Sequence, residues 1–246
     1  VKKTQQFGID NVIISMTSCD ELRQELEVVG AKVIELGAAR GKISPSIIPR
    51  IQNLIRSAKP DIMHTWMYHA NIAGAIALGL SNFQLPMLWS IRQSIENKSL
   101  DKPLTLAIIR LGAILSPFAD SIIYNSFHGA ETHELIGYAK QRTNIILNGV
   151  DVERFRPIEG NRKNILDKLN LQPDNFLIGR IARYSSMKNF PLMLKAFSSV
   201  LQHKRNAILL LIGEECDENN LELITLCRKY ECLSSVRLLG KITNME

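Results

Sequence analysis

Nine short apolar runs alternate with segments of helical periodicity, and this alternation limits the fold more than any other feature of the chain. The runs are rich in β-branched residues and apolar enough to be buried on both faces; they cover 11–15, 31–36, 60–64, 86–91, 120–124, 143–147, 175–182, 206–212 and 235–240. Between most of them apolar residues recur at helical spacing, over 21–29, 47–58, 70–80, 104–115, 129–136 and 221–230. Such an order is typical of parallel sheets covered by helices. We therefore expect an α/β protein with doubly wound parallel sheets.

A break in this pattern divides the chain. From 148 to 164 the sequence is charged, loses its apolar period and is punctuated by Gly149, Pro157 and Gly160, which are turn-forming residue types. A length of 246 residues allows one large domain or two of ordinary size. We interpret the break as a linker, and predict a first domain over 1–157, ending in the linker, and a partial second domain over 158–246.

Composition excludes several classes of protein. Apolar residues make up 46% and charged residues 22%, as in a globular protein. Although the net charge is +6, both signs are interspersed and no basic-aromatic tract occurs, so we expect no nucleic-acid partner. Four cysteines without zinc spacing, and an N-terminal stretch without the apolar core of a signal peptide, predict free thiols in a cytoplasmic protein. The absence of Walker and Gly-x-Gly-x-x-Gly motifs disfavours P-loop enzymes and dehydrogenases.

One amphipathic segment, 46–59, suggests a membrane contact. Arg50, Arg56 and Lys59 lie on or beside its polar side, and such a segment can lie on anionic lipid. Peripheral association with the inner face of the membrane is one interpretation. A solvated basic face over a helix that packs into the core is the commoner one.

Polar residues follow several apolar runs where each run ends. In a doubly wound sheet, ligands bind beyond the carboxyl ends of the strands. Taken singly, each such residue is ordinary turn chemistry; as a set they predict a ligand site in a cleft between the domains. The set comprises His64, Arg92, Asn125, Ser126, Asn148, Gly149, Arg183, Gly213 and Glu214.

The stretch after 60 adds two histidines and an aromatic residue. His64 and His69 can bind a sugar hydroxyl or relay a proton, and Trp66 between them can stack on a sugar face. The alternative is that backbone groups satisfy His64 and that Trp66 packs in an interior. A metal site is disfavoured, because His-x4-His needs a third ligand and no carboxylate is close in sequence.

A strand that passes into a helix at 175–201 carries two cations in its connecting loop. Asn189 is a suitable N-cap and Pro191 falls in the first turn. The helix would therefore present unpaired N–H groups and its positive dipole end to the loop that holds Arg183 and Lys188. This combination predicts an anion site; the alternative is that both cations are solvated surface residues.

Several strings now resemble one family. "ILNGVDVERFRP", "IGRIARYSSMKNFPLMLKAF" and "LLLIGEE" followed by "VRLLGKI" are similar to the glycosyltransferase family 4 branch of the GT-B fold, and "WMYHANIAG", "LWSIRQS" and "FADSIIYNS" extend the likeness over most of the chain. The string from Asn148 to Pro157 is quite specific, and Arg183 with Lys188 matches the Arg-x4-Lys of the family.

The resemblance implies two Rossmann-like domains that face a cleft, and transfer of a hexose from a nucleotide-diphosphate sugar to a hydroxyl of a saccharide or lipid-linked saccharide. It further implies retention of anomeric configuration, no cofactor and no bound metal. Arg183 and Lys188 would hold the donor diphosphate, with Gly213 and Glu214 beside the nucleotide. The acceptor side would comprise Trp66, Arg92, Asn125, Ser126 and Asn148.

Departures from the family are equally informative. The family's second glycine after "LLLIG" is Glu215 here, and Trp66 stands where many members carry a histidine. Either the acid–base or acceptor-orienting role has moved to His69, with His64 as the second candidate, or it is absent. The family's first strand with its Gly-rich loop would precede Val1, and a Glu-x7-Glu segment would follow Glu246. We expect the 246-residue chain to be inactive by itself and the complete protein to be active.

Two other functions remain open at this point. A GT-B-fold sugar-nucleotide epimerase also binds a nucleoside diphosphate, although the Asn-Gly-Val-Asp string disfavours it. A binding module that keeps the sheets but lacks the chemistry is the alternative from outside the enzymes.

Overall fold

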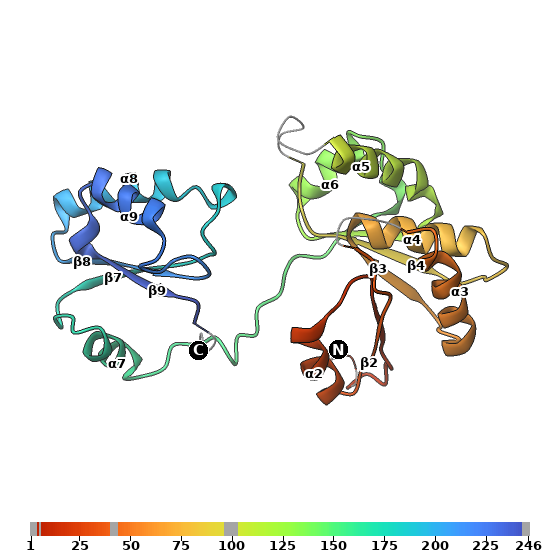
Figure 1. Ribbon diagram of the computed structural model, residues 1–246, viewed down its shortest axis with the longest axis horizontal. Helices are drawn as coiled ribbons and strands as arrows, with labels where there is room; N and C mark the ends of the chain where they lie inside the picture. The colour runs from red at the N-terminus through yellow and green to blue at the C-terminus, as the bar shows by residue number, and fades with distance from the viewer. Residues whose placement is uncertain (1–3, 5, 40–43, 96–102, 243–246) are drawn as a thin grey trace. The chain divides into compact units, whose positions relative to one another are not determined.

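The computed structural model describes all residues except 1–3, 5, 40–43, 96–102 and 243–246. The chain forms two compact units, residues 1–149 and 150–246. The first unit holds two parallel sheets and the second unit holds one, with helices between successive strands. Figure 1 shows the helices and strands of both units.

The first unit contains two parallel sheets. One pairs β1 (Val12–Ser15) with β2 (Lys32–Glu35); the other has the order β3-β4-β5-β6. Its strands are β3 (Met63–Trp66), β4 (Met87–Ile91), β5 (Ser121–Tyr124) and β6 (Thr143–Ile145). The helices are α2 (Asp20–Val28), α3 (Ile47–Ala58), α4 (Met67–Gly79), α5 (Pro103–Leu115) and α6 (Phe127–Glu134), with short 3-10 turns at Ser116–Phe118 and Lys140–Arg142.

Burial of the strands explains why these sequences form sheets. The central strand β4 is apolar on both faces, and Trp89 and Ile91 are completely buried in it. A second apolar cluster joins α3 and α4. Between this cluster and the edges of β1 and β3 lies a mainly apolar cavity of about 320 Å³, lined among others by Ile14, Ile34 and Ile55.

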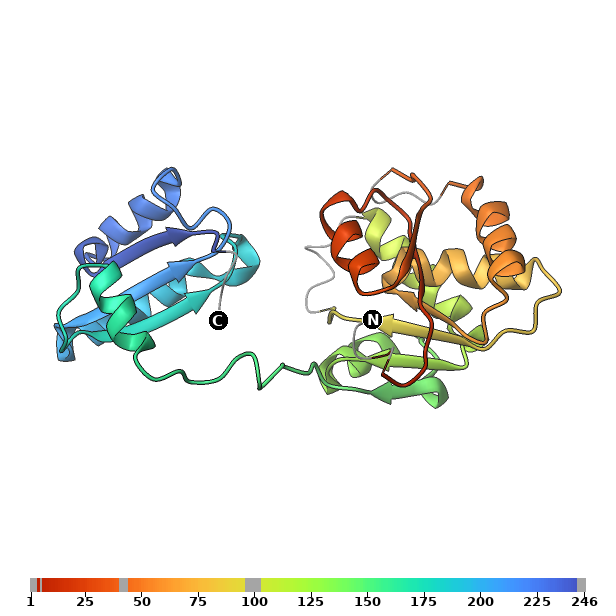
Figure 2. The ribbon, with the colours of Figure 1, turned by 90° about the horizontal axis from the view of Figure 1, so that it is seen from below.

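The second unit is a three-stranded parallel sheet in the order β7-β8-β9. Its strands are β7 (Phe176–Ile181), β8 (Ala207–Ile212) and β9 (Val236–Gly240), and its helices are α7 (Asn161–Lys168), α8 (Phe190–His203) and α9 (Leu221–Lys229), with 3-10 turns at Ser186–Lys188 and Leu233–Ser235. The helices α8 and α9 cover one face of the sheet and α7 lies on the other (Figure 1). Figure 2 shows the three strands side by side and running in the same direction.

Most expected elements are confirmed. Eight of the nine apolar runs contain a strand, and the run 60–64 overlaps β3, which extends beyond it to Trp66. The expected helix at 104–115 is α5, which buries Ile109, Gly112 and Ala113, and the run 120–124 contains β5. In the part of the chain that the structure describes, no helix is long and apolar enough to cross a bilayer. All four cysteines are free thiols, as predicted.

The predicted linker is wrong in one respect. The helix α7 begins at Asn161, inside the stretch interpreted as a linker. This helix buries only one residue, Leu166, so its sequence shows almost no apolar period. Because periodicity is the main signal for a helix, a polar surface helix of this kind escapes prediction.

Candidate functional site

Four of the predicted cleft residues meet in the first unit, near the carboxyl ends of β3, β4 and β6. The rings of His64 and Trp66 lie with their centroids 5.2 Å apart. The guanidinium of Arg92 lies 5.0 Å from the centre of the Trp66 ring, and its Nη2 donates a hydrogen bond to Oδ1 of Asn148. The structure thus joins residues that are separated by up to 84 positions of sequence, from His64 to Asn148, in one side-chain cluster.

The strand β3 explains how two of these side chains reach solvent. It continues to Trp66, so the prediction that His64 ends the strand is wrong. Alternation along the strand places His64 and Trp66 on the exposed face, while Thr65 between them is buried. The chain then turns sharply at Met67, whose φ of 69° lies in the left-handed region. Consequently Trp66 stands at the end of the strand with 52% of its surface exposed.

His64 is held in a defined position. Its Nε2 lies 2.8 Å from Oγ of Ser90, the residue of β4 that pairs with Trp66. Desolvation by its neighbours lowers the pKa of His64 below its ordinary value, and the positive charge of Arg92 lowers this pKa further. A neutral imidazole is therefore favoured near neutral pH, and such a ring can accept a proton.

The other predicted residues of this unit are His69, Asn125 and Ser126. His69 is the third residue of α4 and is half-buried. Asn125 follows β5 and is also half-buried. Ser126 is the N-cap of α6, where its Oγ accepts a hydrogen bond from the Gly129 N–H at 2.9 Å. The structure therefore gives Ser126 a capping role, which accounts for its residue type without a ligand.

In the second unit the loops after β7 and β8 are joined by their main chains. The Ala182 N–H donates to the Ile212 carbonyl and the Tyr184 N–H to the Glu214 carbonyl, both at 2.9 Å. Gly213 has a φ of 144°, and a Cβ at this position would lie 2.3 Å from the Ala182 oxygen and 2.9 Å from the Arg183 nitrogen. Only glycine allows this approach. The structure therefore brings Arg183, Gly213 and Glu214 together.

The two predicted cations lie on the single loop between β7 and α8. Both side chains are exposed. The described residues provide neither Arg183 nor Lys188 with a side-chain hydrogen bond or ion pair. Lys188 ends the 3-10 turn Ser186–Lys188, which the Lys188 N–H closes on the Ser185 carbonyl at 3.0 Å. Two exposed positive charges are thus available to an anion at this loop.

The N-terminus of α8 offers fewer free amides than predicted. Asn189 is the N-cap, as expected, and its Oδ1 accepts from the Leu192 N–H at 3.3 Å. Pro191 has no N–H, and the Met193 N–H donates to the Asn189 carbonyl. Among the described residues, no acceptor faces the remaining N–H of the first turn, that of Phe190. The prediction of several unpaired N–H groups is therefore wrong: among the described residues, the first turn of α8 leaves only the N–H of Phe190 unpaired.

Sequence reasoning missed two residues that build these sites. Ser90 lies in the otherwise apolar strand β4, and its polar side chain is the only signal in the sequence that could have identified it. Arg180 lies within β7, and its Nη2 donates to the main-chain oxygen of Lys188. A charged residue inside an otherwise apolar strand is the signal that could have identified Arg180.

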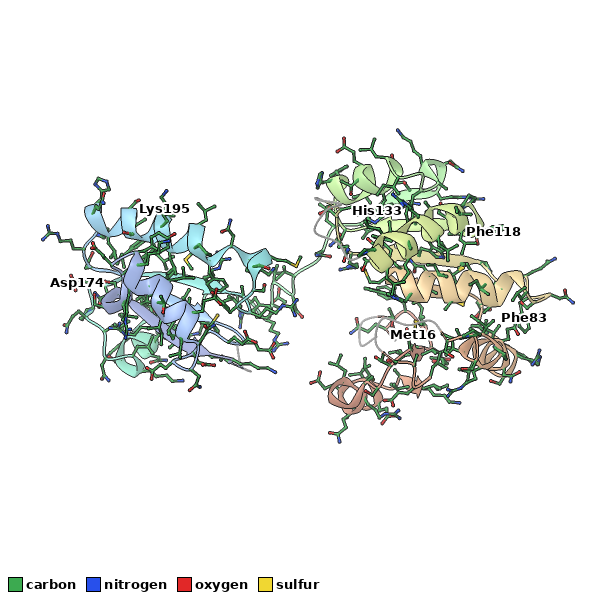
Figure 3. The ribbon with its side chains drawn as sticks, turned by 45° about the horizontal axis from the view of Figure 1, so that its top comes forward. Met16, Phe83, Phe118, His133, Asp174 and Lys195 are labelled. Carbon is green, nitrogen blue, oxygen red and sulfur yellow. The ribbon has the colours of Figure 1, made fainter. Side chains whose placement is uncertain are left out.

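The histidine at 133 also escaped notice, but it belongs to the core. His133 is fully buried, its Nε2 lies 2.8 Å from the Tyr68 hydroxyl, and its Nδ1 lies 2.7 Å from the Gly129 carbonyl. It lies inside the first unit, between helices (Figure 3). Burial lowers the pKa of His133, although the bond to Gly129 opposes that shift. Within the described ranges, no three metal-binding side chains of the His, Cys, Asp or Glu type are grouped.

Comparison with known proteins agrees with this architecture. The family model of Glycosyltransferase Family 4 matches residues 1–154. The structure is similar to that of HepE from Anabaena in complex with UDP-glucose, with a TM-score of 0.74 at 17% identity, over 95% of this chain and 62% of HepE. It is similar to a glycosyltransferase from Rickettsia africae, with a TM-score of 0.75 at 17% identity, over 99% of this chain and 63% of that one. The chain thus spans less than two thirds of either protein.

A more distant likeness concerns the epimerases. A putative UDP-N-acetylglucosamine 2-epimerase from Listeria monocytogenes gives a TM-score of 0.53 at 18% identity, over 96% of this chain and 62% of the epimerase. The lower score places this chain nearer to the glycosyltransferases in fold. The predicted GT-B fold, with Rossmann-like parallel sheets, is confirmed.

Proposed function

Because this chain belongs to glycosyltransferase family 4, we propose that it transfers a hexose from a nucleotide-diphosphate sugar to a hydroxyl group of a saccharide or lipid-linked saccharide, with retention of anomeric configuration. The observation that carries the proposal is the pair of exposed cations, Arg183 and Lys188, on the loop that precedes α8. UDP-glucose, the ligand of the HepE structure, is a sugar donor with a diphosphate group of the kind that these two cations could bind.

The reaction breaks the bond between the anomeric carbon and a phosphate oxygen. Negative charge then develops on the leaving diphosphate, and groups aimed at that charge stabilise the transition state more than the bound donor. A guanidinium can bind two phosphate oxygens at once, and an ammonium acts as a mobile point charge. Arg183 and Lys188 supply both on one loop, and we assign the leaving-group role to them without a metal ion. Activity in the presence of excess EDTA tests that assignment.

On the nucleotide side, the role falls to the loop after β8. The main chain at Gly213 is locked against Ala182 and Arg183, so a nucleotide bound beside Gly213 and Glu214 would place its phosphates next to Arg183. Glu215 has a φ of 60°, which is the conformation that a glycine adopts readily. Glu215 can therefore adopt the backbone conformation of the second glycine of the family, although it carries a side chain.

The acceptor side of the proposal uses the cluster of the first unit. The exposed indole of Trp66 offers an apolar edge to a sugar, while Arg92 and Asn148 offer polar groups. His64, whose pKa is lowered by desolvation and by Arg92, can accept a hydrogen bond from a hydroxyl when it is neutral. His69 in the first turn of α4 is the candidate acid–base group, as the sequence predicts.

A donor panel tests the proposal. We would incubate the full-length natural protein with UDP-, GDP- and ADP-hexoses and saccharide or lipid-linked acceptors, and follow products by mass spectrometry and NMR. The expected product is a glycoside with the anomeric configuration of the donor. Release of isomerised sugar nucleotide would instead identify an epimerase, and binding without any product would identify a binding module.

Peripheral membrane contact is a separate part of the proposal. The apolar residues of α3, including Ile47, Ile51 and Ile55, are buried in the core, and Arg50 donates to the carbonyls of Glu35 and Leu36. Contact would therefore rest on Arg56 and Lys59 alone, as an electrostatic attraction to anionic lipid. Flotation with anionic vesicles but not with neutral ones would support it, and equal flotation with both would contradict it.

A further inference from the structure

One charged side chain faces the interior of the second unit. Along β7, Ile178 and Ala182 pack against the apolar core formed with α8 and α9. Arg180 lies between them and shares their face, because side chains alternate along a strand. It is half-buried. An arginine at a core-facing position departs from the apolar pattern of the other strands, and such departures are expected where function requires them.

Two contacts of Arg180 lead to the far end of the anion-binding loop. Its Nη2 donates a hydrogen bond to the main-chain oxygen of Lys188. Its guanidinium lies 4.8 Å from the centre of the Phe190 ring, and Phe190 is the buried first residue of α8. Its Nε is buried, and no acceptor for it lies among the described residues. A methionine would fill this space without burying an unpaired donor, so packing alone does not account for the residue.

Different devices hold the two ends of the loop. Near Arg183, main-chain hydrogen bonds and the close approach of Gly213 fix the backbone. At Lys188, one 3-10 turn is followed by Asn189 in the left-handed conformation, with a φ of 46°. Arg180 ties the main chain at Lys188 to the sheet, while the buried ring of Phe190 anchors the start of α8 in the core.

We propose that Arg180 is a positioning residue of the diphosphate site, which holds the main chain at Lys188 so that the ammonium of Lys188 meets the same anion as Arg183. The inference rests on the proposed function, because it requires that Arg183 and Lys188 bind one anion. Arg180 acts through the Lys188 carbonyl and the Phe190 ring, and it also adds a permanent positive charge behind the loop.

The test measures binding of inorganic pyrophosphate to the 246-residue chain by NMR titration of the amides of the loop. Four variants are compared with the wild type: Arg180→Met, Arg180→Lys, Arg183→Ala and the control Arg237→Met. Arg237 also lies on the sheet and donates to main-chain carbonyls, those of Ser234 and Val236. It lies at the opposite end of its strand from Gly240, so Arg237→Met removes the same charge away from the loop. Thermal unfolding of each variant is recorded in parallel, because a purely structural role would change the melting temperature and leave the affinity of the folded protein unchanged.

We expect Arg180→Met to bind pyrophosphate at least about three-fold more weakly than Arg237→Met, since a hydrogen bond from a charged group is lost. A smaller difference would overturn the role of Arg180. If Arg180→Met does not fold, Arg180→Lys provides the test, because it keeps the positive charge but loses the planar guanidinium. An affinity for pyrophosphate more than two-fold below that of the wild type supports the positioning role. An affinity within two-fold of the wild type overturns it. Arg183→Ala distinguishes failure of the inference about Arg180 from failure of the proposed anion site. If only Arg183→Ala binds pyrophosphate more weakly, the role of Arg180 is overturned and the anion site stands. If Arg183→Ala binds as tightly as the wild type, or if the wild type does not bind, the anion site itself is overturned.

Discussion

The two units build their candidate sites in opposite ways. In the first unit the side chains hold one another: His64 contacts Ser90 and Trp66, and Arg92 bridges Trp66 and Asn148. In the second unit the main chain forms most of the site, and the side chain of Arg180 holds only the end at Lys188. Gly213 and the bonds between the loops after β7 and β8 fix the backbone, and Arg183 and Lys188 extend from it into solvent.

This difference teaches which substitutions should affect folding and which should affect ligands. Where side chains are bonded to each other, replacing one changes the state of its neighbours, so their contributions are coupled. Where the backbone forms the site, the exposed cations can change with little effect on stability.

Gly213→Ala should destabilise the second unit strongly. A Cβ would lie 2.3 Å from the Ala182 oxygen, in a backbone conformation with a φ of 144°. We expect a loss of about 3 kcal/mol or more in the free energy of unfolding, measured by urea denaturation followed by circular dichroism. Gly179→Ala in β7 is the control, because a Cβ added there would meet no atom within 4 Å. Equal stability of the two variants would contradict the close approach of the loops.

Acidification should weaken the first unit more than the second. The pKa values of His64 and His133 are lowered in the folded state, mainly by desolvation. Below about pH 6.5 the unfolded chain therefore binds protons that the folded chain does not, and stability falls as the pH drops toward the folded pKa values. Both tryptophans, Trp66 and Trp89, lie in the first unit, so their fluorescence follows the unfolding of that unit.

His133→Gln should reduce this dependence on pH, because it removes the buried titrating ring and keeps a polar partner for Tyr68. His203→Gln is the matched control, since His203 is an exposed histidine at the end of α8 in the second unit. A first-unit melting temperature that falls equally between pH 7 and pH 5 in His133→Gln and in the control would contradict the contribution of His133.

Arg92 and Asn148 should show a coupling energy of about 0.5–1 kcal/mol in a double-mutant cycle, because one bonds directly to the other. The measurement is the free energy of unfolding of the two alanine variants and their combination, again by tryptophan fluorescence. Arg92→Ala combined with Lys195→Ala provides the control, because Lys195 is an exposed residue of α8 in the other unit (Figure 3). Additive effects in both pairs would show that the cluster is not held by its side chains.

Glu215→Gly should have the smallest effect. The residue has a φ of 60°, a conformation that costs a non-glycine residue about 1 kcal/mol and glycine almost nothing. Glycine also gains entropy in the unfolded chain, so we expect a net change below about 1 kcal/mol in chemical denaturation. A large loss of stability would mean that the carboxylate of Glu215 stabilises the loop.

The sequence predicted the elements well and the details of the sites less well. Strands such as β8, with five of its six residues buried, leave an unmistakable apolar run. The helix α7 was missed because Leu166 is its one buried residue. The anion loop was predicted from Arg183, Lys188 and Asn189. The side chain of Asn189, however, accepts a hydrogen bond from the N–H of Leu192, which the prediction counted as free.

Residues whose role depends on contacts far along the chain could not be predicted. Ser90 meets His64 only because β3 and β4 pair in one particular register. From its sequence alone Arg180 resembles a surface cation, because the face of β7 on which it lies is not known. The hydrogen bond from Arg92 to Asn148 joins the residues that follow β4 and β6, two strands that are separated by β5 in the sheet. Local pattern fixes neither register nor side-chain direction across strands.

The turnover number of Arg183→Ala/Lys188→Ala, measured in the full-length natural protein with saturating donor, tests the account most directly. We expect kcat to fall by about 100-fold or more while donor affinity falls less, because these cations act on charge that develops as the donor bond breaks. Lys195→Ala/Arg205→Ala removes two exposed cations from the same unit and should leave kcat within about two-fold. A kcat equal to that of the wild type in the Arg183→Ala/Lys188→Ala variant would contradict the account.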